Sequence, residues 1–375
     1  MRPFIPLGVG ATIAFALSLV PVARGADSPA NPALEKQYAE TVSKAYSYLS
    51  TKGQAADGSF SMQDGPAVTA IVAHGLLKTG RSASDPVVVK ALAYVQKFVH
   101  PDGGIYGDGS RHKNYETCAS LPAFVAANGD GRYTDLIAKA DAFVRSIQWD
   151  AKNGVEKSDD KFGGAGYGDS TRPDLSNTAF LIDALRSAGA KPDDPALQEA
   201  LIFVSRCQNL ESPYNTTPFP AKNPDGGFYY TPSAGGSSPA GETPNKGLRS
   251  YGSMTYAGLK SMIFAGVGPD DPRVKAATKW VQSHYDLDSN PDMGSAGLYY
   301  YYHALAKALD AVGSDTIEDS QGQKHEWRTD LIAELAKRQQ DNGSWVNENK
   351  RWMEGDANLV TGYVLLTLSY CQPKK

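Results

Sequence analysis

The chain has 375 residues, with 37 Lys and Arg against 41 Asp and Glu, so its formal net charge is −4 at pH 7. A mildly acidic chain without a basic run lacks the electrostatic footprint of a nucleic-acid-binding protein. The cysteine count of three is odd and does not indicate a disulfide framework, and the six histidines show no spacing typical of a metal site. We therefore expect neither a metal nor a cofactor.

The first 25 residues are typical of a secretory signal peptide. Arg2 precedes an apolar run over residues 4–22, and a small-x-small cleavage pattern ends at Gly25. No later apolar run in the sequence approaches the length of a membrane-spanning helix. We expect an exported protein, periplasmic or extracellular, that is soluble after cleavage; an uncleaved N-terminal anchor is the alternative.

The rest of the chain repeats one helical pattern. A small or polar residue is followed seven positions later by an apolar residue, which lies two turns along the same helix face, and then by a Gly near position +11. The six copies begin at Thr69, Thr117, Thr178, Thr255, Tyr302 and Thr361. The steps between them are 48, 61, 77, 47 and 59 residues. A unit lengthened by insertions is indicated.

Each unit contains two kinds of helix. Three copies end in a Gly that is followed five residues later by Asp-Pro, at positions 85–86, 194–195 and 271–272. This pattern indicates the end of one helix and then the N-cap and first residue of the next. The helices after Asp-Pro carry charges on one side, whereas the helices that contain the repeated Thr or Tyr are apolar almost all round. We expect the first kind outside and the second kind inside.

A Gly- and aromatic-rich segment joins each outer helix to the next inner helix. These segments are residues 57–60, 102–106, 162–167, 225–230, 294–299 and 341–345. Hairpins that cannot bury their own apolar faces must pack against one another. We predict an all-α fold, an (α/α)6 toroid of six outer/inner hairpins, that forms one domain over residues 26–375 with a long insertion at residues 206–250.

The last of these segments resembles a known repeat. Gln340, Gly343 and Trp345 are similar to the QW repeat of the squalene cyclases, and positions 54, 58 and 60 resemble a relaxed copy. The whole mature chain resembles the prenyltransferase and squalene oxidase repeat superfamily, whose fold is an (α/α)6 toroid. The resemblance implies a terpenoid cyclase-like activity, of the isomerase or transferase class, on an isoprenoid in the central cavity. The cyclases carry two barrels and this chain has room for one, so we expect a single-barrel, exported member.

The acid motif of that family is only partly present. In squalene-hopene type cyclases a DxDD motif precedes the equivalent inner helix, and its central acid protonates the polyene. The matching stretch here begins with Asp174, while Ser176 and Asn177 replace two of the acids. The resemblance leaves Asp174 and Glu116 as candidate catalytic acids, although Asp at such a position is more often an N-cap. Of the zinc ligands of protein prenyltransferases, only His303 has a near match.

The mouth of the ring is the expected binding site. If the inner helices are parallel, their N-termini converge there and their dipoles attract anions. The candidate anion-binding residues are Arg111, Lys113, Arg172, Arg249 and Arg351. The candidate cavity-facing residues are Tyr115, Asn177, Tyr251, Tyr300, Tyr301 and His303. Aromatic walls suit an isoprenoid through cation–π attraction, and they equally suit stacked sugar rings.

Three functional hypotheses follow. The first is a cyclase-like or transferase-like enzyme acting on an isoprenoid, and the resemblance favours it. The second is an exported lyase-type enzyme acting on an acidic glycan, with Arg or Tyr as acid or base. The third is a toroid without catalytic activity that binds a small molecule, an acidic glycan or other anionic ligand, or a protein partner.

Overall fold

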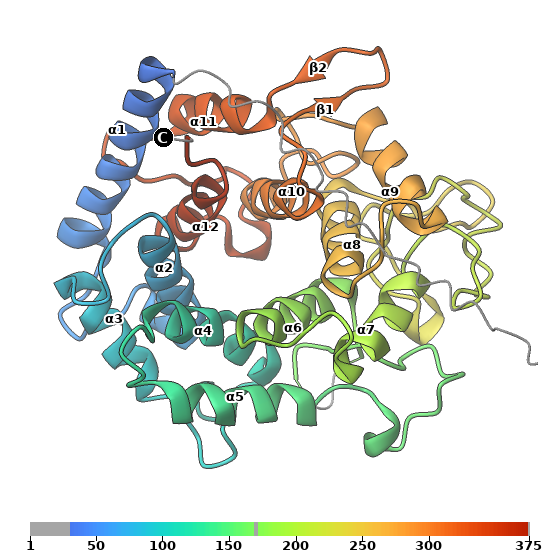
Figure 1. Cartoon of the computed structure of the whole chain (residues 1–375), viewed down its shortest axis with the longest axis horizontal. Helices are drawn as coiled ribbons and strands as arrows, with labels where there is room; N and C mark the ends of the chain where they lie inside the picture. The colour runs from blue at the N-terminus through green and yellow to red at the C-terminus, as the bar shows by residue number, and fades with distance from the viewer. Residues whose placement is uncertain (1–30, 169–171, 374–375) are drawn as a thin grey trace, which may run out of the picture.

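The computed structural model describes residues 31–168 and 172–373, and their helices form two concentric rings (Figure 1). The inner helices are α2 (Pro66–Lys78), α4 (Lys113–Ala127), α6 (Leu175–Ser187), α8 (Gly252–Phe264), α10 (Leu298–Val312) and α12 (Ala357–Ser369). The outer helices are α1 (Pro32–Tyr48), α3 (Pro86–Gln96), α5 (Thr134–Ser146), α7 (Pro195–Arg206), α9 (Pro272–Ser283) and α11 (Trp327–Arg338). The predicted (α/α)6 toroid is confirmed.

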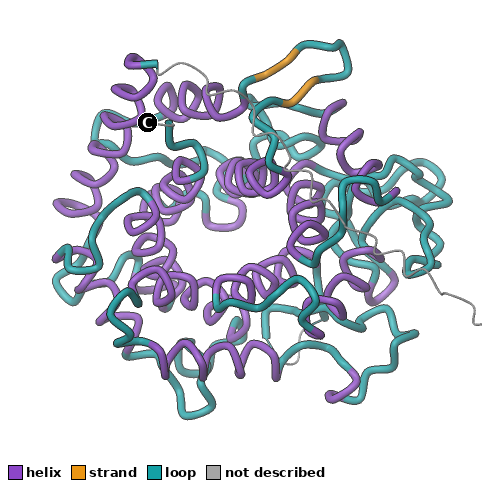
Figure 2. The backbone as a smooth tube through the Cα atoms, in the orientation of Figure 1, coloured by secondary structure: helices purple, strands orange, loops and turns teal. Residues whose placement is uncertain are grey.

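Little other regular structure accompanies the helices. The strands β1 (Ile317–Glu318) and β2 (Lys324–His325) form a short antiparallel hairpin, which stands at the edge of the molecule in Figure 2. A π-helical turn follows α1 at Leu49–Gly53, and short 3-10 turns lie at Met62–Asp64, Ala151–Asn153, Ser233–Gly235 and Arg351–Met353. Within the described ranges, every helix is too short or too polar to span a bilayer.

The outer helices begin where the Asp-Pro pairs predict. The carboxylates of Asp85, Asp194 and Asp271 accept hydrogen bonds from backbone N–H groups two residues later, at 2.9, 2.9 and 2.8 Å. Each is followed by Pro at the first helical position. This position has no intrahelical N–H bond to lose, so the pair starts each helix efficiently.

The repeated threonines hold the Gly- and aromatic-rich segments against the inner helices. The hydroxyl oxygens of Thr69, Thr178 and Thr255 accept hydrogen bonds from buried backbone N–H groups of these segments, at 2.9, 3.0 and 3.1 Å. Thr117 and Thr361 do the same for the second and sixth segments. Tyr302 departs from this role, because its hydroxyl donates to the carbonyl of Leu287 instead.

A repeated glutamine ties four of the segments to the following outer helix. The Nε2 group of Gln54 donates to Gly58 O in its own segment and to Val87 O at the start of α3, at 3.1 and 2.9 Å. Gln148 and Gln208 make the same pair of bonds to the starts of α7 and α9. One side-chain amide thus satisfies two carbonyl groups and fixes the spacing of adjacent hairpins.

The last glutamine closes the ring. Gln339 donates to Gly343 O and to Thr41 O of α1, at 2.9 and 3.0 Å. Gln340, which the sequence assigned to the QW-like repeat, does not make this contact: its side chain is exposed and accepts a hydrogen bond from the Ser344 hydroxyl at 3.0 Å. α12 also packs against α2, so the first and last hairpins adjoin (Figure 1).

Close approach explains the glycine of this motif. Gly343 has φ +92°, and a Cβ atom there would lie 2.3 Å from the Lys44 carbonyl oxygen of α1. Gly58 has φ +95° and would place a Cβ atom 2.4 Å from the Lys90 carbonyl oxygen of α3. Both the backbone conformation and the contact therefore require Gly.

Replacing Gln339 with Ala should lower the free energy of unfolding by ~1–3 kcal/mol, because two buried carbonyl groups each lose a hydrogen bond at the point of ring closure. Gln340→Ala is the matched control and should change it by ~0.5 kcal/mol or less, as expected for an exposed side chain. Chemical denaturation of both variants measures the difference. Equal losses would show that Gln339 has no special part in closing the ring.

Candidate functional site

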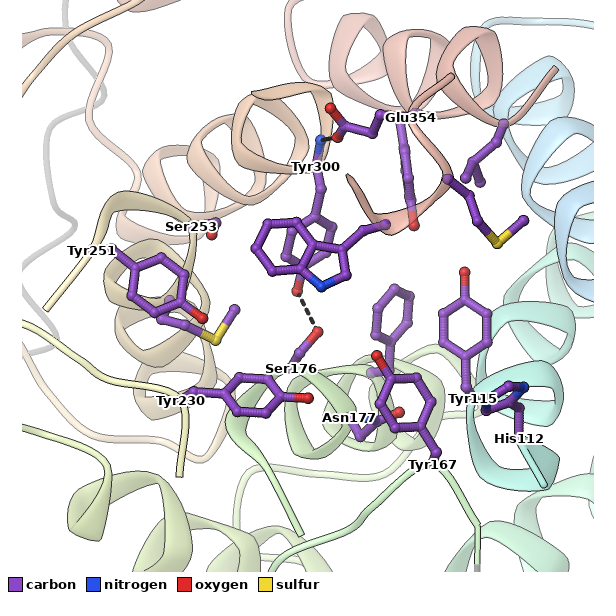
Figure 3. Close-up of a pocket in the computed structure, with 16 residues that line it drawn as sticks. His112, Tyr115, Tyr167, Ser176, Asn177, Tyr230, Tyr251, Ser253, Tyr300 and Glu354 are labelled. Atoms are coloured by element: carbon purple, nitrogen blue, oxygen red, sulfur yellow. Dashed lines mark hydrogen bonds between the residues drawn. The ribbon is translucent and has the colours of Figure 1, made fainter. Parts of the chain in front are cut away.

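A cavity of about 280 Å³ lies at the end of the ring where the inner helices begin (Figure 3). Its lining comes from the first two turns of α4, α6, α8, α10 and α12 and from loops that precede them, so these five inner helices point their N-termini at one mouth. The lining residues are His112, Tyr115, Tyr167, Ser176, Asn177, Phe180, Tyr230, Tyr251, Ser253, Met254, Tyr300, Trp352, Met353, Glu354, Leu359 and Tyr363.

Aromatic rings form most of this wall. The Tyr115 ring meets Phe180 edge to face, with centroids 5.2 Å apart, and Phe180 stacks on Tyr300 at 6.1 Å. Tyr300 in turn contacts Tyr363 at 5.9 Å. Figure 3 shows Tyr115, Tyr167 and Tyr300 around one space. Such a continuous wall favours the binding of an apolar or ring-containing ligand.

Several predicted cavity residues lie in the lining and others do not. Tyr115, Asn177, Tyr251 and Tyr300 line the cavity. Tyr301 does not, because it is fully buried and its hydroxyl donates to the Asp286 carbonyl at 2.7 Å. His303 lines a second, smaller cavity next to the first.

Neither predicted catalytic acid is among the lining residues. Asp174 caps α6: its two oxygens accept from the backbone N–H and the side-chain amide of Asn177, each at 2.8 Å. Burial raises the pKa of Asp174 to about 6, although the bonds from Asn177 oppose the rise. Glu116 accepts from Gly107 N and the Ser110 hydroxyl, at 2.7 and 2.5 Å. Both carboxylates therefore hold local structure and lie outside the described cavity lining.

Glu354 is a carboxylate that the sequence did not single out. It is the one acidic side chain among the described lining residues and is 1% exposed. Its Oε1 accepts from Tyr300 N at the start of α10 at 2.8 Å (Figure 3). Its Oε2 accepts from Asn347 Nδ2 at 2.7 Å. Burial raises the pKa of Glu354, while these hydrogen bonds favour its charged form.

The predicted cations do not enter the cavity. Arg111, Arg172, Arg249 and Arg351 are exposed, Lys113 is half-buried, and the described lining contains none of the five. Arg172 donates to the Ser237 hydroxyl, and the Arg351 guanidinium lies 4.3 Å from the Trp352 ring centroid. The side chain of Lys113 lies over the Tyr106 ring at 5.1 Å. None of the five forms part of the described cavity wall.

The N-termini of three inner helices are also occupied. Asp174 caps α6, Glu354 accepts from the first turn of α10, and Asp356 accepts from Asn358 N and Leu359 N of α12 at 2.8 and 2.9 Å. A carboxylate at a helix N-terminus uses the N–H groups and offsets the dipole that would attract an external anion. The physical basis of the expected anion site at the mouth is therefore weakened at these three helices.

The tyrosines of the cavity are neutral donors. Burial raises the pKa of Tyr115 to about 12, and it also raises the pKa values of Tyr167, Tyr230, Tyr300 and Tyr363. The Tyr300 hydroxyl shares a hydrogen bond with Ser176 Oγ at 3.2 Å. A neutral phenol can orient a ligand, but it is a poor general base at neutral pH.

Sequence reasoning missed several lining residues for different reasons. Phe180 follows the predicted Asn177 by about one helical turn, so extending that helix face would have found it. Tyr363 lies on α12, for which no cavity-facing residue was predicted. Tyr167 and Tyr230 come from loops. Trp352 and Met353 are exposed and have φ 53° and 64°, a left-handed conformation in non-Gly residues that marks a strained segment at the mouth.

The described residues contain no cluster of three or more His, Cys, Asp or Glu side chains that could hold a metal ion. Cys118, Cys207 and Cys371 are buried as free thiols.

Comparison with known proteins places the chain among α/α toroids. Residues 39–231 match the model of the squalene-hopene cyclase C-terminal domain. A protein from Actinoplanes is 16% identical over 89% of this chain and 99% of its own, with a TM-score of 0.52. A glycosidase in complex with glucose is 13% identical over 91% and 98%, also with a TM-score of 0.52. A polysaccharide lyase is 10% identical over 89% and 96%, with a TM-score of 0.50. These structural likenesses show the fold alone. The curated proteins include no match.

The role of Asp174 can be tested through pH. Because burial raises its pKa from 3.8 to about 6, the folded state holds this proton more tightly than the unfolded state. The free energy of unfolding should therefore fall as pH rises through this window. Asn at the same position still caps α6 but carries no charge.

We expect the wild type to lose ~1–3 kcal/mol of stability relative to Asp174→Asn between about pH 4 and about pH 7. Denaturation of both proteins across this range measures the difference. Parallel stability curves would show that Asp174 is not a buried capping carboxylate.

Proposed function

Because the chain belongs to the squalene-hopene cyclase C-terminal domain family, we propose that it binds an isoprenoid in the aromatic cavity. The observation that carries the proposal is the wall itself: eight of the described lining residues are Tyr, Phe or Trp, and Met254, Met353 and Leu359 add further apolar surface. The described lining contains no Lys or Arg. A flexible hydrocarbon chain would bury its surface here at little polar cost.

For conversion of a bound isoprenoid, Glu354 is the candidate acid. Proton transfer requires a donor within reach of the ligand, and Glu354 lines the cavity while Asp174 and Glu116 do not. The raised pKa of Glu354 increases the fraction of this side chain that is protonated. The hydrogen bonds from Tyr300 N and Asn347 act in the other direction and favour the charged form. The geometry therefore supports binding more strongly than protonation of an alkene, and terpenoid cyclase-like turnover through Glu354 is the further step of the proposal.

An acidic glycan is less well supported as the ligand. A lyase must neutralise the sugar carboxylate and remove a proton with a base. The candidate cations Arg111, Arg172 and Arg249 lie outside the cavity lining, and the raised pKa values of the cavity tyrosines disfavour a phenolate base. The same reasons disfavour an anionic ligand at the mouth.

We also propose that the protein is exported. The support is the sequence pattern of residues 1–25, which lie outside the described residues. On expression in a secreting bacterial host, the mature protein should begin at Ala26 and be found outside the cytoplasm. N-terminal sequencing and fractionation measure this, and intact chains starting at Met1 in the cytoplasm would refute it.

Isothermal titration with geraniol tests the binding proposal. Phe180→Ala should weaken geraniol binding by about tenfold or more, because the ring contributes apolar surface between Tyr115 and Tyr300 worth ~1.5–3 kcal/mol. Arg172→Ala is the matched control, since this exposed residue is outside the lining, and it should bind as the wild type does.

Circular dichroism confirms that both variants are folded. Sulfate and an oligouronate serve as competing ligand classes in the same assay. The isoprenoid would be replaced by an acidic glycan under two joint results. Geraniol does not bind, and the oligouronate binds the wild type but not the Arg111, Arg172, Arg249 triple alanine variant.

A further inference from the structure

A second cavity of about 20 Å³ adjoins the aromatic cavity, and Phe180 and Tyr300 line both. This volume leaves room for a small group only. Its charged and polar lining comes from three consecutive inner helices: Asp183 of α6, Lys260 of α8, and His303 and Lys307 of α10. None of these groups has a part in the function proposed above.

The charges in this small cavity do not balance. Asp183 Oδ1 accepts from Lys260 Nζ at 2.6 Å, and Asp183 Oδ2 pairs with Lys307 Nζ at 2.7 Å. The three side chains are only 12%, 5% and 16% exposed, respectively. Two ammonium groups against one carboxylate leave one net positive charge. A buried charge without a counter-ion is strongly unfavourable, so a further anion would stabilise the arrangement.

His303 provides a second and independent indication. It is 9% exposed, and its Nδ1 atom has no hydrogen-bond partner among the described residues. Burial, reinforced by Lys307, lowers the pKa of His303 well below its usual value, so the ring is neutral. A neutral imidazole carries one N–H donor, and a buried polar atom left unpaired is destabilising. A small acceptor in the cavity would give this ring a partner.

We propose that this cavity binds a small monoanionic group, the carboxylate of a ligand whose apolar part lies in the aromatic cavity. The inference rests on the proposed function and narrows the ligand from any isoprenoid to an apolar acid. The carboxylate neutralises the excess charge and accepts hydrogen bonds from a lysine ammonium group and from the His303 ring. The ligand contacts Phe180 and Tyr300, the two rings that line both cavities.

The site has a defined pH dependence. Burial lowers the pKa of Lys260 to about 8, partly offset by Asp183. Burial opposes the charge of Asp183, but the two lysines hold its pKa below the usual value, and Asp183 in turn keeps Lys307 charged. The other titratable groups around the site, His74, Cys118, His303 and Tyr370, are shifted toward their neutral forms. The net positive charge is therefore present below about pH 8 and is lost above it, as Lys260 deprotonates.

Titration with three compounds that share one C10 tail and differ in their head group tests the inference. At about pH 7, geranic acid should bind at least about tenfold more tightly than geraniol, and geranylamine should bind no more tightly than geraniol. Binding of geraniol without any advantage for the acid would overturn this inference and leave the proposed function standing. Failure of all three compounds to bind would overturn both.

Substitutions in the triad of Asp183, Lys260 and Lys307 should change the affinity advantage of geranic acid over geraniol in opposite directions. Lys260→Met and Lys307→Met each remove the excess charge and should reduce the acid's advantage to about twofold or less, with geraniol affinity unchanged. Asp183→Asn removes the negative charge and should increase the affinity advantage of the acid over geraniol. Arg172→Ala should change neither affinity. An undiminished advantage in both lysine variants would place the carboxylate elsewhere.

Two further arms complete the test. If the lysine variants do not fold, the wild-type pH series decides: the acid's advantage should fall above about pH 8, and a constant advantage to about pH 9.5 would overturn the inference. Chloride is compared with gluconate at equal ionic strength. Competition of chloride with geranic acid supports the site, whereas chloride binding with no advantage for the acid would assign the site to a free ion and overturn the ligand carboxylate.

Discussion

The structure depends on side-chain hydrogen bonds that satisfy the backbone of the segments between outer and inner helices. Buried peptide groups need partners, and these segments lack a helix or sheet of their own. Thr69 and its counterparts accept from the N–H groups, while Gln54 and its counterparts donate to the carbonyl groups and reach the next outer helix. Gln339 repeats this contact on α1, and the series of hairpins becomes a ring. Closure then brings the first turns of the inner helices to one mouth.

The electrostatics of the mouth follow from how those helices are capped. Carboxylates take up the free N–H groups at α6, α10 and α12, so the positive ends of these dipoles are already neutralised within the protein. The space between them is lined by aromatic rings and suits a hydrocarbon. Positive charge is found instead at the triad of Asp183, Lys260 and Lys307, next to the deep end of that wall. An apolar tail and an anionic head thus have separate places in the bore.

The repeat was predictable from sequence because its signals are local. An Asp-Pro pair such as Asp85 with Pro86 is a local signal for the start of a helix. The spacing from Thr69 to Gly80 indicates two helical turns followed by the end of the helix. Gln339 and Gln340 could not be separated in this way, since only the backbone direction decides which amide reaches Thr41. Glu354 and Trp352 enter the cavity from a loop with left-handed residues, for which the sequence offers no periodic signal. The expected cations lie outside the described cavity lining, because local backbone conformation and not sequence order directs their side chains.

A crystal structure of the protein soaked with geranic acid measures the central claim most directly, because it locates both ends of the ligand at once. The account predicts density for the hydrocarbon chain along Tyr115, Phe180 and Tyr300, with the carboxylate beside Lys260 and His303. Density confined to the exterior arginines, such as Arg172 and Arg249, or an empty aromatic cavity at saturating ligand would contradict it.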